Sequence, residues 1–426
     1  MVDSDARERR KRGQTTVSTK PWSVPVYAAL VVAILLLVGC GEPPSPIQDD
    51  PRGRPWPEIE QSARGATVHF AMWAGDPAIN RYVREFIAPR LKARHQIELV
   101  IVPAQGDIPA LLAAELASGR DTSAYDLLWI NGENFYKLRE LDALYGPFTA
   151  LLPNDAFVDW ANPRIARDFQ QDVAGMEAPW GTVQLLLIAD RARVPAPPTD
   201  VAALAAWIKA HPGRFTFDRA FTGMSFLKTL MLALADDRKA LDGPFDEARY
   251  VALRDRAFSW LRDVRPALWR EGRSFPRGVG ELHQLFANGE VDFTMSMNDG
   301  EVDNKVASGL FPASAYAYAL ASGTLANTHY LGIPARAAHK AAALVVVNEL
   351  QSPEAQLEKQ RATVWGDGTV LDVARLPAPW PARFEEAEAR RHAPPRGELA
   401  ARALAEPSPE VMIRLERDFR ASFVAE

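Results

Sequence analysis

The chain has 426 residues, 47% of them apolar, and a formal net charge of −5. This length is enough for two compact lobes, and the apolar content is enough for sizeable cores. The acidic balance argues against a nucleic-acid binder, which needs a basic surface, and a single cysteine excludes a disulfide framework.

The first 65 residues divide into a basic segment, an apolar run and a polar stretch. Residues 7–20 carry six Lys or Arg residues, and the apolar run 24–39 ends at Cys40, the only cysteine. This order is typical of a secretory signal peptide. The run is short for a membrane-spanning helix, which takes about 20 apolar residues, although an uncleaved helical anchor remains the alternative. Residues 40–65, rich in Pro and charge, are predicted to form a flexible tether.

The next part of the chain alternates predicted strands and helices. Residues 66–73, 97–103 and 125–131 are predicted strands, and the segments 74–95 and 107–119 between them are predicted helices. Asp76 is a candidate N-cap for the first helix, and Pro77 suits its first position. The β-α-β-α-β order indicates a parallel sheet covered by helices. No glycine-rich phosphate-binding loop follows any of these strands, which argues against a nucleotide site.

The second part of the chain continues as an α/β sequence. A long strand is predicted over 176–194, then helices near 201–210 and 221–235, the second capped by Thr222 or Ser225. A helix near 250–272, a helix–strand pair over 279–299, and a strand and helix over 327–350 follow. The last 60 or so residues are predicted to be mostly helical, with Pro-rich breaks.

Ligands of open parallel sheets bind beyond the carboxyl ends of the strands. This rule selects residues after the first and third strands, and similar polar or aromatic positions occur near later element boundaries. The candidate site residues are Trp73, Asp76, Asn131, Glu133, Asn134, Trp180, Thr222, Gly223, Ser225, Asn298, Asp299, His329 and Trp365. Backbone N–H groups at the start of the helix beginning near 221 could also bind an anion.

Several of these residues also have a purely structural interpretation. Asp76 and Asn134 are also consistent with helix caps, Glu133 with a solvated surface charge, and His329 with a structural hydrogen bond. Trp129, inside an apolar strand, is expected in the core. The sequence has no Gly-x-Ser-x-Gly or His-Glu-x-x-His motif, and its seven histidines are scattered, so no catalytic or metal site is predicted and no cofactor is expected.

These segments together resemble a known family. Leu37-Val38-Gly39-Cys40 resembles a bacterial lipobox, and "FAMWAGDPAINRYVREFIAPRL", "YDLLWINGENFYKL", "FTGMSFLKTLM", "FANGEVDFTMSMNDG" and "SPEAQLEKQRATVWGD" resemble the solute-binding proteins of bacterial ABC importers. The likeness covers residues 66–384, and it is to the YnjB-like subgroup, which is related to binders of thiamine, polyamines and iron.

The resemblance implies an α/β, two-lobed periplasmic binding protein fold of type II, each lobe a mixed, mostly parallel sheet flanked by helices, with a hinge between them. It implies one lobe of residues 66–177 with 327–350 and a second of 178–326 with 351–426. It further implies a signal peptide over 1–39, lipidation of Cys40, a monomer in the cell envelope, and ABC permease subunits as partners. Because Gly41 is not Asp, the outer membrane is the expected anchor in a Gram-negative cell. After removal of residues 1–39 the net charge is about −8.

The resemblance places the candidate site residues in the cleft between the lobes. Carboxylates and tryptophans in one cleft would suit a small cationic or zwitterionic metabolite, thiamine-like or amine-like. Adjacent tyrosines, common in iron-binding relatives, are absent, because the chain has only Tyr316-Ala-Tyr318. A secreted lipoprotein hydrolase and an envelope scaffold protein remain the alternative functions.

Overall fold

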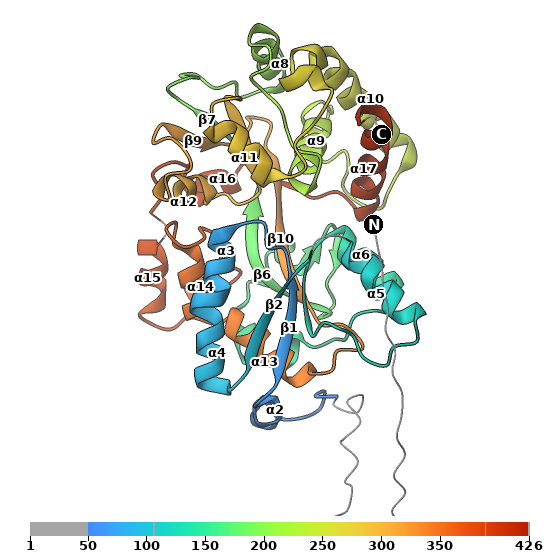
Figure 1. The fold of residues 1–426 in the computed structure, drawn as a ribbon, viewed down its shortest axis with the longest axis vertical. Coiled ribbons are helices and arrows are strands. Elements are labelled where there is room, and N and C mark those ends of the chain that lie inside the picture. Colours follow the sequence, from blue (N-terminus) through green and yellow to red (C-terminus); the bar gives the residue numbers. More distant parts are fainter. Residues whose placement is uncertain (1–49, 105–106, 388, 425–426) are drawn as a thin grey trace, which may run out of the picture. The chain divides into compact units, whose positions relative to one another are not determined.

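The computed structural model describes residues 50–104, 107–387 and 389–424 (Figure 1). The predicted signal peptide, Cys40 and the first part of the predicted tether lie outside the described residues. In the part that is described, no helix is both long enough and apolar enough to cross a membrane.

The second half of the predicted tether is structured. Helix α2 (Trp56–Ala63) begins after Pro55 and packs against α13 (Lys340–Leu350). Ile59 and Ala63, one helical turn apart, are buried in the same core as α13. The prediction of a flexible segment up to residue 65 is therefore wrong for this helix, because its two apolar residues share one face.

A six-stranded mixed sheet forms the centre of the first lobe. The order is β11-β10-β3-β1-β2, with β6 also paired to β10. The pairs of β1 with β2 and β3 are parallel, whereas β10 runs antiparallel to both β3 and β6. The strand bounds are β1 Thr67–Met72, β2 Glu98–Pro103, β3 Leu127–Ile130, β6 Glu177–Gln184, β10 Thr324–Gly332 and β11 Ala403–Ala405. The predicted parallel β-α-β-α-β unit is confirmed.

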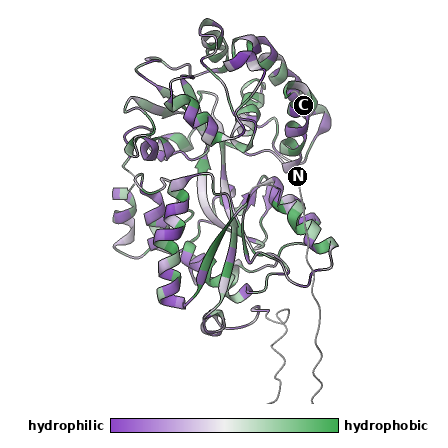
Figure 2. Cartoon of the chain, viewed as in Figure 1, coloured by the Kyte–Doolittle hydropathy of each residue, from purple (hydrophilic) through white to green (hydrophobic). Residues whose placement is uncertain are grey.

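Helices flank this sheet as the apolar spacing predicts. The first helical run comprises α3 (Pro77–Arg81), a π-helical turn (Tyr82–Ile87) and α4 (Ala88–His95), and Asp76 caps it by accepting from the Ala78 N–H at 2.6 Å. The other helices of this lobe are α5 Ile108–Ala117, α6 Glu133–Glu140, α7 Pro163–Ala166, α13, α14 Pro353–Gln360 and α15 Trp380–Ala387. Figure 2 shows hydrophilic and hydrophobic residues alternating along the helices, as expected where one face is buried.

The second lobe has its own sheet and its own core. Its strands are β7 (Leu186–Asp190), β8 (Phe293–Ser296) and β9 (Ala315–Tyr318), in the order β8-β7-β9. Both pairs are antiparallel, so this small sheet departs from the mostly parallel arrangement that we expected in each lobe. Its helices are α8 Val201–Ala210, α9 Phe221–Ala233, α10 Glu247–Val264, α11 Val279–Ala287, α12 Glu301–Ala307, α16 Arg396–Ala400 and α17 Pro409–Phe423.

Short elements complete the described chain. They are a two-stranded hairpin, β4 Arg167–Asp168 with β5 Gln171–Asp172, and the 3-10 turns Thr149–Leu151, Pro153–Phe157, Arg265–Ala267, Trp269–Gly272 and Val373–Arg375. Helix α9 begins where the sequence predicts, but its capping differs from the prediction. Its N-cap is Ala220, and Thr222 and Ser225 lie inside the helix, so neither caps it.

The chain crosses between the two cores at positions that differ from the expected lobe boundaries. Trp180 lies in the first core, whereas Val183 already packs against the second, so the first crossing lies between these two residues. Residues 351–384 were expected in the second lobe, but this was wrong. Ala355 and Trp365 are buried in the first core together with residues of its sheet, and Phe384 packs in a neighbouring cluster with Leu357 of α14.

Candidate functional site

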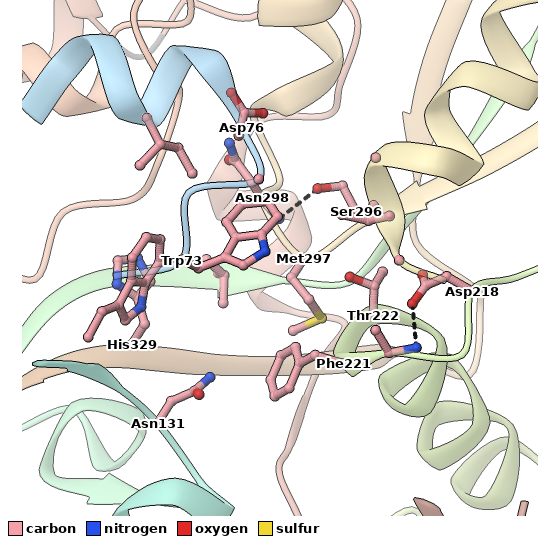
Figure 3. Close-up of a pocket in the computed structure, with 18 of the residues that line it drawn as sticks. Trp73, Asp76, Asn131, Asp218, Phe221, Thr222, Ser296, Met297, Asn298 and His329 are labelled. Atoms are coloured by element: carbon pink, nitrogen blue, oxygen red, sulfur yellow. Dashed lines mark hydrogen bonds between the residues drawn. The ribbon is translucent and has the colours of Figure 1, made fainter. Parts of the chain in front are cut away.

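A cavity of about 830 Å³ lies between the two lobes. The first lobe lines it with residues that follow β1 and β3, at the carboxyl ends of those strands. The second lobe lines it with the starts of α9 and α11 and the end of β8. Figure 3 shows Trp73 and Asn131 from the first lobe together with Asp218, Thr222 and Met297 from the second. A ligand here would contact both lobes.

Most of the predicted site residues line this cavity. Those that do are Trp73, Asp76, Asn131, Glu133, Asn134, Thr222, Asn298, His329 and Trp365. Asn134 is the second residue of α6 and not its cap, because Gly132 occupies that position with a φ of 52°. A side chain on Gly132 would also overlap the Phe169 ring, so glycine is needed at this turn.

Four predicted residues do not line the cavity. Trp180 is completely buried beneath the other tryptophans, and Ser225 is completely buried inside α9. Gly223 packs directly against the backbone of Asp218. Asp299 is paired with Arg390 at 2.9 Å and Arg396 at 3.2 Å.

An aromatic cluster forms the floor of the cavity on the first-lobe side. Ring centroids are 5.0 Å apart for Trp129 and Trp180, 5.1 Å for Trp180 and Trp365, and 4.9 Å for Trp129 and His329. Trp73 contacts the edge of this cluster and keeps 42% of its surface exposed. It therefore offers an accessible aromatic face to a ligand. Trp129, expected in the core, is only partly buried and lines the cavity.

A buried polar triad holds His329 in place. His329 Nε2 lies 2.9 Å from Asp367 Oδ2, which also accepts from Lys359 Nζ at 2.6 Å. Burial lowers the pKa of His329, so the ring is neutral. The ionised Asp367 accepts the Nε2 proton, which leaves Nδ1 as an acceptor. Gly181 makes the arrangement possible, because a Cβ there would overlap both side chains.

An ion-pair network joins the two lobes beside the cavity. Lys305 of α12 pairs with Asp76, the cap of α3, and lies 3.3 Å from Glu301 Oε1. Glu301 Oε1 is in turn 3.3 Å from His283 Nε2 and Glu301 Oε2 accepts from the Ser296 hydroxyl. Asp76 is thus both a helix cap and an inter-lobe partner, and both of its oxygens are occupied.

Hydrogen bonds from side chains to backbone carbonyls, and one close backbone contact, also join the two lobes next to this ion-pair network. Asn298 Nδ2 donates to the Trp365 carbonyl at 3.0 Å, and Asn304 Nδ2 donates to the Val364 carbonyl at 3.1 Å. Gly300 and Gly366 touch through their backbones, so a side chain on Gly300 would not fit. Asn298 therefore lines the cavity with its amide already engaged in holding the lobes together.

Two carboxylates in the cavity have no cationic partner among the described residues. Glu133, at the start of α6, leaves Oε2 without a hydrogen bond. Asp218 precedes α9, accepts from the Ala220 N–H at 2.9 Å through Oδ1, and leaves Oδ2 without a partner. Burial raises the pKa of Glu133 and raises that of Asp218 to about 6.

The structure adds cavity residues that we did not predict from the sequence. The most important are Asp218, Phe221, Met297, Asn327 and Asp367. Asp218 and Phe221 flank the N-terminus of α9, a boundary that the apolar periodicity placed correctly. Nothing in the local sequence marks Asp367, because it acts through His329, which lies 38 residues earlier.

Within the described ranges, no group of three or more His, Cys, Asp or Glu side chains is arranged to hold a metal ion.

Comparison with known proteins identifies relatives of this chain. A family model described as "Bacterial extracellular solute-binding protein" matches residues 87–388. Protein YnjB of Escherichia coli (strain K12) is 39% identical over 327 residues, which is 76% of this chain and 84% of that protein.

Solved structures share the fold at low sequence identity. A substrate-binding protein of an ABC transporter from Bradyrhizobium japonicum USDA 110 aligns with a TM-score of 0.61 and 17% identity, covering 84% of this chain and all of that one. A putative spermidine/putrescine ABC transporter protein from Listeria monocytogenes aligns with a TM-score of 0.60 and 14% identity, covering 83% and 98%. These matches confirm the two-lobed α/β fold.

Proposed function

The chain belongs to the family of bacterial extracellular solute-binding proteins, and we propose that it captures a small cationic or zwitterionic metabolite between its lobes for an ABC importer. The family accounts for solute capture outside the cytoplasm, and the lining of the cavity supports the charge of the solute.

The observation that carries this proposal is the excess of carboxylates around the cavity. Asp76, Glu133, Asp218, Glu281, Glu301 and Asp367 line it, against one arginine, Arg277. Lys305 and Lys359 compensate three of these acids, and Arg277 lies 3.3 Å from Glu281. Glu133 and Asp218 make no ion pair with any residue in the described part of the chain, and a cation in the cavity would supply one.

Trp73 supports the same charge. Its exposed ring lies on the cavity, and a ring face attracts a cation by about 0.5–2 kcal/mol, depending on how far the cation is desolvated. For a zwitterion, Arg277 and the N–H groups at the starts of α9 and α11 would receive the anionic end.

The two-lobed arrangement supports capture by closure. Glu133 belongs to the first lobe and Asp218 to the second, so a ligand that contacts both stabilises only the closed form. Its binding free energy then shifts the population toward closure, and the importer would recognise that form.

The test is a thermal-shift screen of the purified protein with organic cations, zwitterions and anions, together with mass spectrometry of copurifying compounds. A ligand at 100 times its dissociation constant should add about 2.7 kcal/mol of stability. Stabilisation by phosphonates or sulfonates alone would overturn the proposed charge of the solute.

The anchoring part of the proposal rests on the sequence. Cys40 would carry the lipid that holds a monomeric protein at the membrane, the outer membrane in a Gram-negative cell. Metabolic labelling with a radioactive fatty acid should mark the wild-type protein and leave the Cys40→Ser variant unlabelled. Equal labelling of both proteins would contradict lipidation at this position.

A further inference from the structure

A short hairpin of the first lobe reaches into the core of the second lobe. Its strands are β4 and β5, and its turn is formed by Phe169 and Gln170. The base of the hairpin is fixed to the first lobe, because Val173 is buried in the same cluster as Tyr330 and the Tyr330 hydroxyl donates to the Ile165 carbonyl at 3.0 Å. Phe169, at the tip, is 2% exposed and belongs to the second core. The hairpin is therefore a contact between the lobes that is separate from the crossing in β6.

The backbone of the turn is unfavourable for the residues that form it. Phe169 and Gln170 have φ angles of 42° and 66°, in the left-handed region that suits glycine and asparagine. Hairpin turns with two such residues usually carry Asn-Gly for that reason. A Phe-Gln pair at this turn indicates that the two side chains make contacts that offset the unfavourable backbone.

Phe169 is anchored in the second lobe by packing and by a buried charge. Its ring centroid lies 6.5 Å from that of Phe221 and 4.3 Å from Lys228 Nζ, and both residues belong to α9. An ammonium group at this distance is attracted to the ring, more strongly when it is shielded from water, and Lys228 is completely buried. Withdrawing Phe169 would therefore remove apolar burial from the second lobe and an aromatic partner from Lys228.

Gln170 adds hydrogen bonds from the tip to the second lobe. Its Nε2 donates to the Glu406 carbonyl at 2.8 Å and to the Leu241 carbonyl at 3.2 Å. Its Oε1 accepts from the Gly243 N–H at 2.5 Å. Leu241 is buried in the second core, and Gly243 lies just beyond it in the chain. One side chain thus holds the tip to two separate segments.

The hairpin also contacts the first-lobe turn that precedes Glu133. Asp168 Oδ2 accepts a hydrogen bond from the Gly132 N–H, and a Cβ on Gly132 would overlap the Phe169 ring. The tip therefore lies against the first lobe on one side and against α9 on the other. Neither Phe169 nor Gln170 lines the cavity, so their contacts act on the lobes and not on the solute.

We propose that residues 167–172 are a tether that restrains opening of the cleft, with Phe169 as its anchor in the second lobe. The inference rests on the proposed capture by closure and does not depend on the charge of the solute. Because the hairpin is fixed to the first lobe at its base and to the second at its tip, opening has to deform the hairpin or withdraw Phe169. Either change is unfavourable, so the tether shifts the population toward the closed form.

The experiment measures the separation of the lobes by single-molecule fluorescence energy transfer, in buffer without added solute. The dyes are attached at Lys92→Cys on α4 and Lys209→Cys on α8, in a Cys40→Ser background that removes the only native cysteine. Both lysine side chains are exposed, at 62% and 48%, and Figure 1 shows the two helices in opposite lobes. The open form appears as a population with lower transfer efficiency.

Two variants weaken the tether in different ways. Phe169→Ala removes the anchor. Gln170→Asn keeps a residue that tolerates the left-handed backbone, but its amide is one methylene group too short for the three hydrogen bonds. We expect the open fraction to rise about tenfold in Phe169→Ala and by a smaller factor in Gln170→Asn.

The matched control is Phe258→Ala. Phe258 lies on α10 and is also 2% exposed in the second core, so its loss should lower the stability of this lobe to urea as the loss of Phe169 does. The open fraction should stay unchanged in this variant. An equal rise in Phe258→Ala would refute the tether, because opening would then follow from a weakened second core alone.

A positive control separates the tether from the proposed function. Lys305→Met breaks the inter-lobe ion pair and should open the cleft without touching the hairpin. If it raises the open fraction and neither hairpin variant does, the tether is refuted and capture by closure stands. If no variant opens, the lobes do not move against each other and both proposals fail. Circular dichroism reports the folding of each variant, and Gln170→Asn decides the outcome where Phe169→Ala does not fold.

Discussion

Replacing Lys305 with Met tests whether the inter-lobe ion pair holds the cleft closed. Lys305 and Asp76 side chains are 8% and 9% exposed, and Glu301 lies beside the same ammonium group. The variant would leave two buried carboxylates without their shared cation. Breaking a buried pair in this way costs about 3–5 kcal/mol.

Opening of the cleft can relieve this unfavourable burial, because Lys305 and Asp76 belong to different lobes. Opening the cleft would return Asp76 to water, so the expected effect is a shift toward the open form as well as a loss of stability. Since 1.4 kcal/mol corresponds to tenfold in affinity, a cost of about 3–5 kcal/mol would weaken solute binding by up to about 10²–10⁴-fold. Calorimetry measures this change, and small-angle scattering should show a larger radius of gyration without solute.

The matched control is the double variant Asp76→Asn with Lys305→Met. Asn keeps an oxygen to cap the Ala78 N–H and removes the charge that the single variant leaves unpaired. Binding should therefore recover at least in part. If Lys305→Met alone had the affinity and the scattering profile of the unmodified protein, the ion pair would contribute nothing to closure and the reasoning would be refuted.

Three further predictions concern the cavity and the strand β6. Affinity for a cation should fall as the pH drops through about 6, because the carboxylate form of Asp218 is the one that binds. Calorimetry at a series of pH values should show this fall in the unmodified protein and not in Asp218→Asn. The pKa of Glu177, completely buried with both oxygens unpartnered, is raised well above its usual value, so the folded protein keeps a proton that the unfolded chain releases above about pH 4.5. The free energy of unfolding should therefore fall as the pH rises above that value. Urea unfolding at a series of pH values should show a smaller fall for Glu177→Gln than for the unmodified protein. If the fall with pH is the same in both, the effect belongs to Asp168, whose pKa is also raised by burial. Trp73→Ala should bind a cation about tenfold more weakly with little change in stability. Trp180→Ala should instead lower the free energy of unfolding, measured with urea, by about 3–5 kcal/mol. Similar losses of stability in the two variants would contradict the different roles assigned to these tryptophans.

Local sequence patterns were sufficient for the order of strands and helices in residues 66–131, which form the parallel part of the first lobe's sheet. The spacing of apolar residues in 66–131 sets the order of strands and helices, and Asp76 with Pro77 marks the start of α3. The carboxyl-end rule then leads to Trp73, Asn131 and Glu133, which line the cavity. These predictions succeed because each depends on residues close together in the chain.

Contacts between residues that are far apart in the sequence could not be predicted from these local patterns. Asp76 is equally plausible as a cap or a ligand contact until Lys305, 229 residues away, occupies its second oxygen. Ser225 and Thr222 differ by less than one helical turn, yet only Thr222 lines the cavity. Which side of α9 faces the cleft depends on how the helix packs in the second core.

The sequence by itself determined the α/β class, the first three strands of the first sheet and the strand ends at which a ligand would bind, because short-range periodicity and capping encode them. Only the tertiary structure decided that Glu133 and Asp218 lack cationic partners, that Asp367 fixes His329, and that residues 351–384 complete the first lobe. Charge compensation and burial are set by packing between segments far apart in the chain, and no local pattern records which segments will meet.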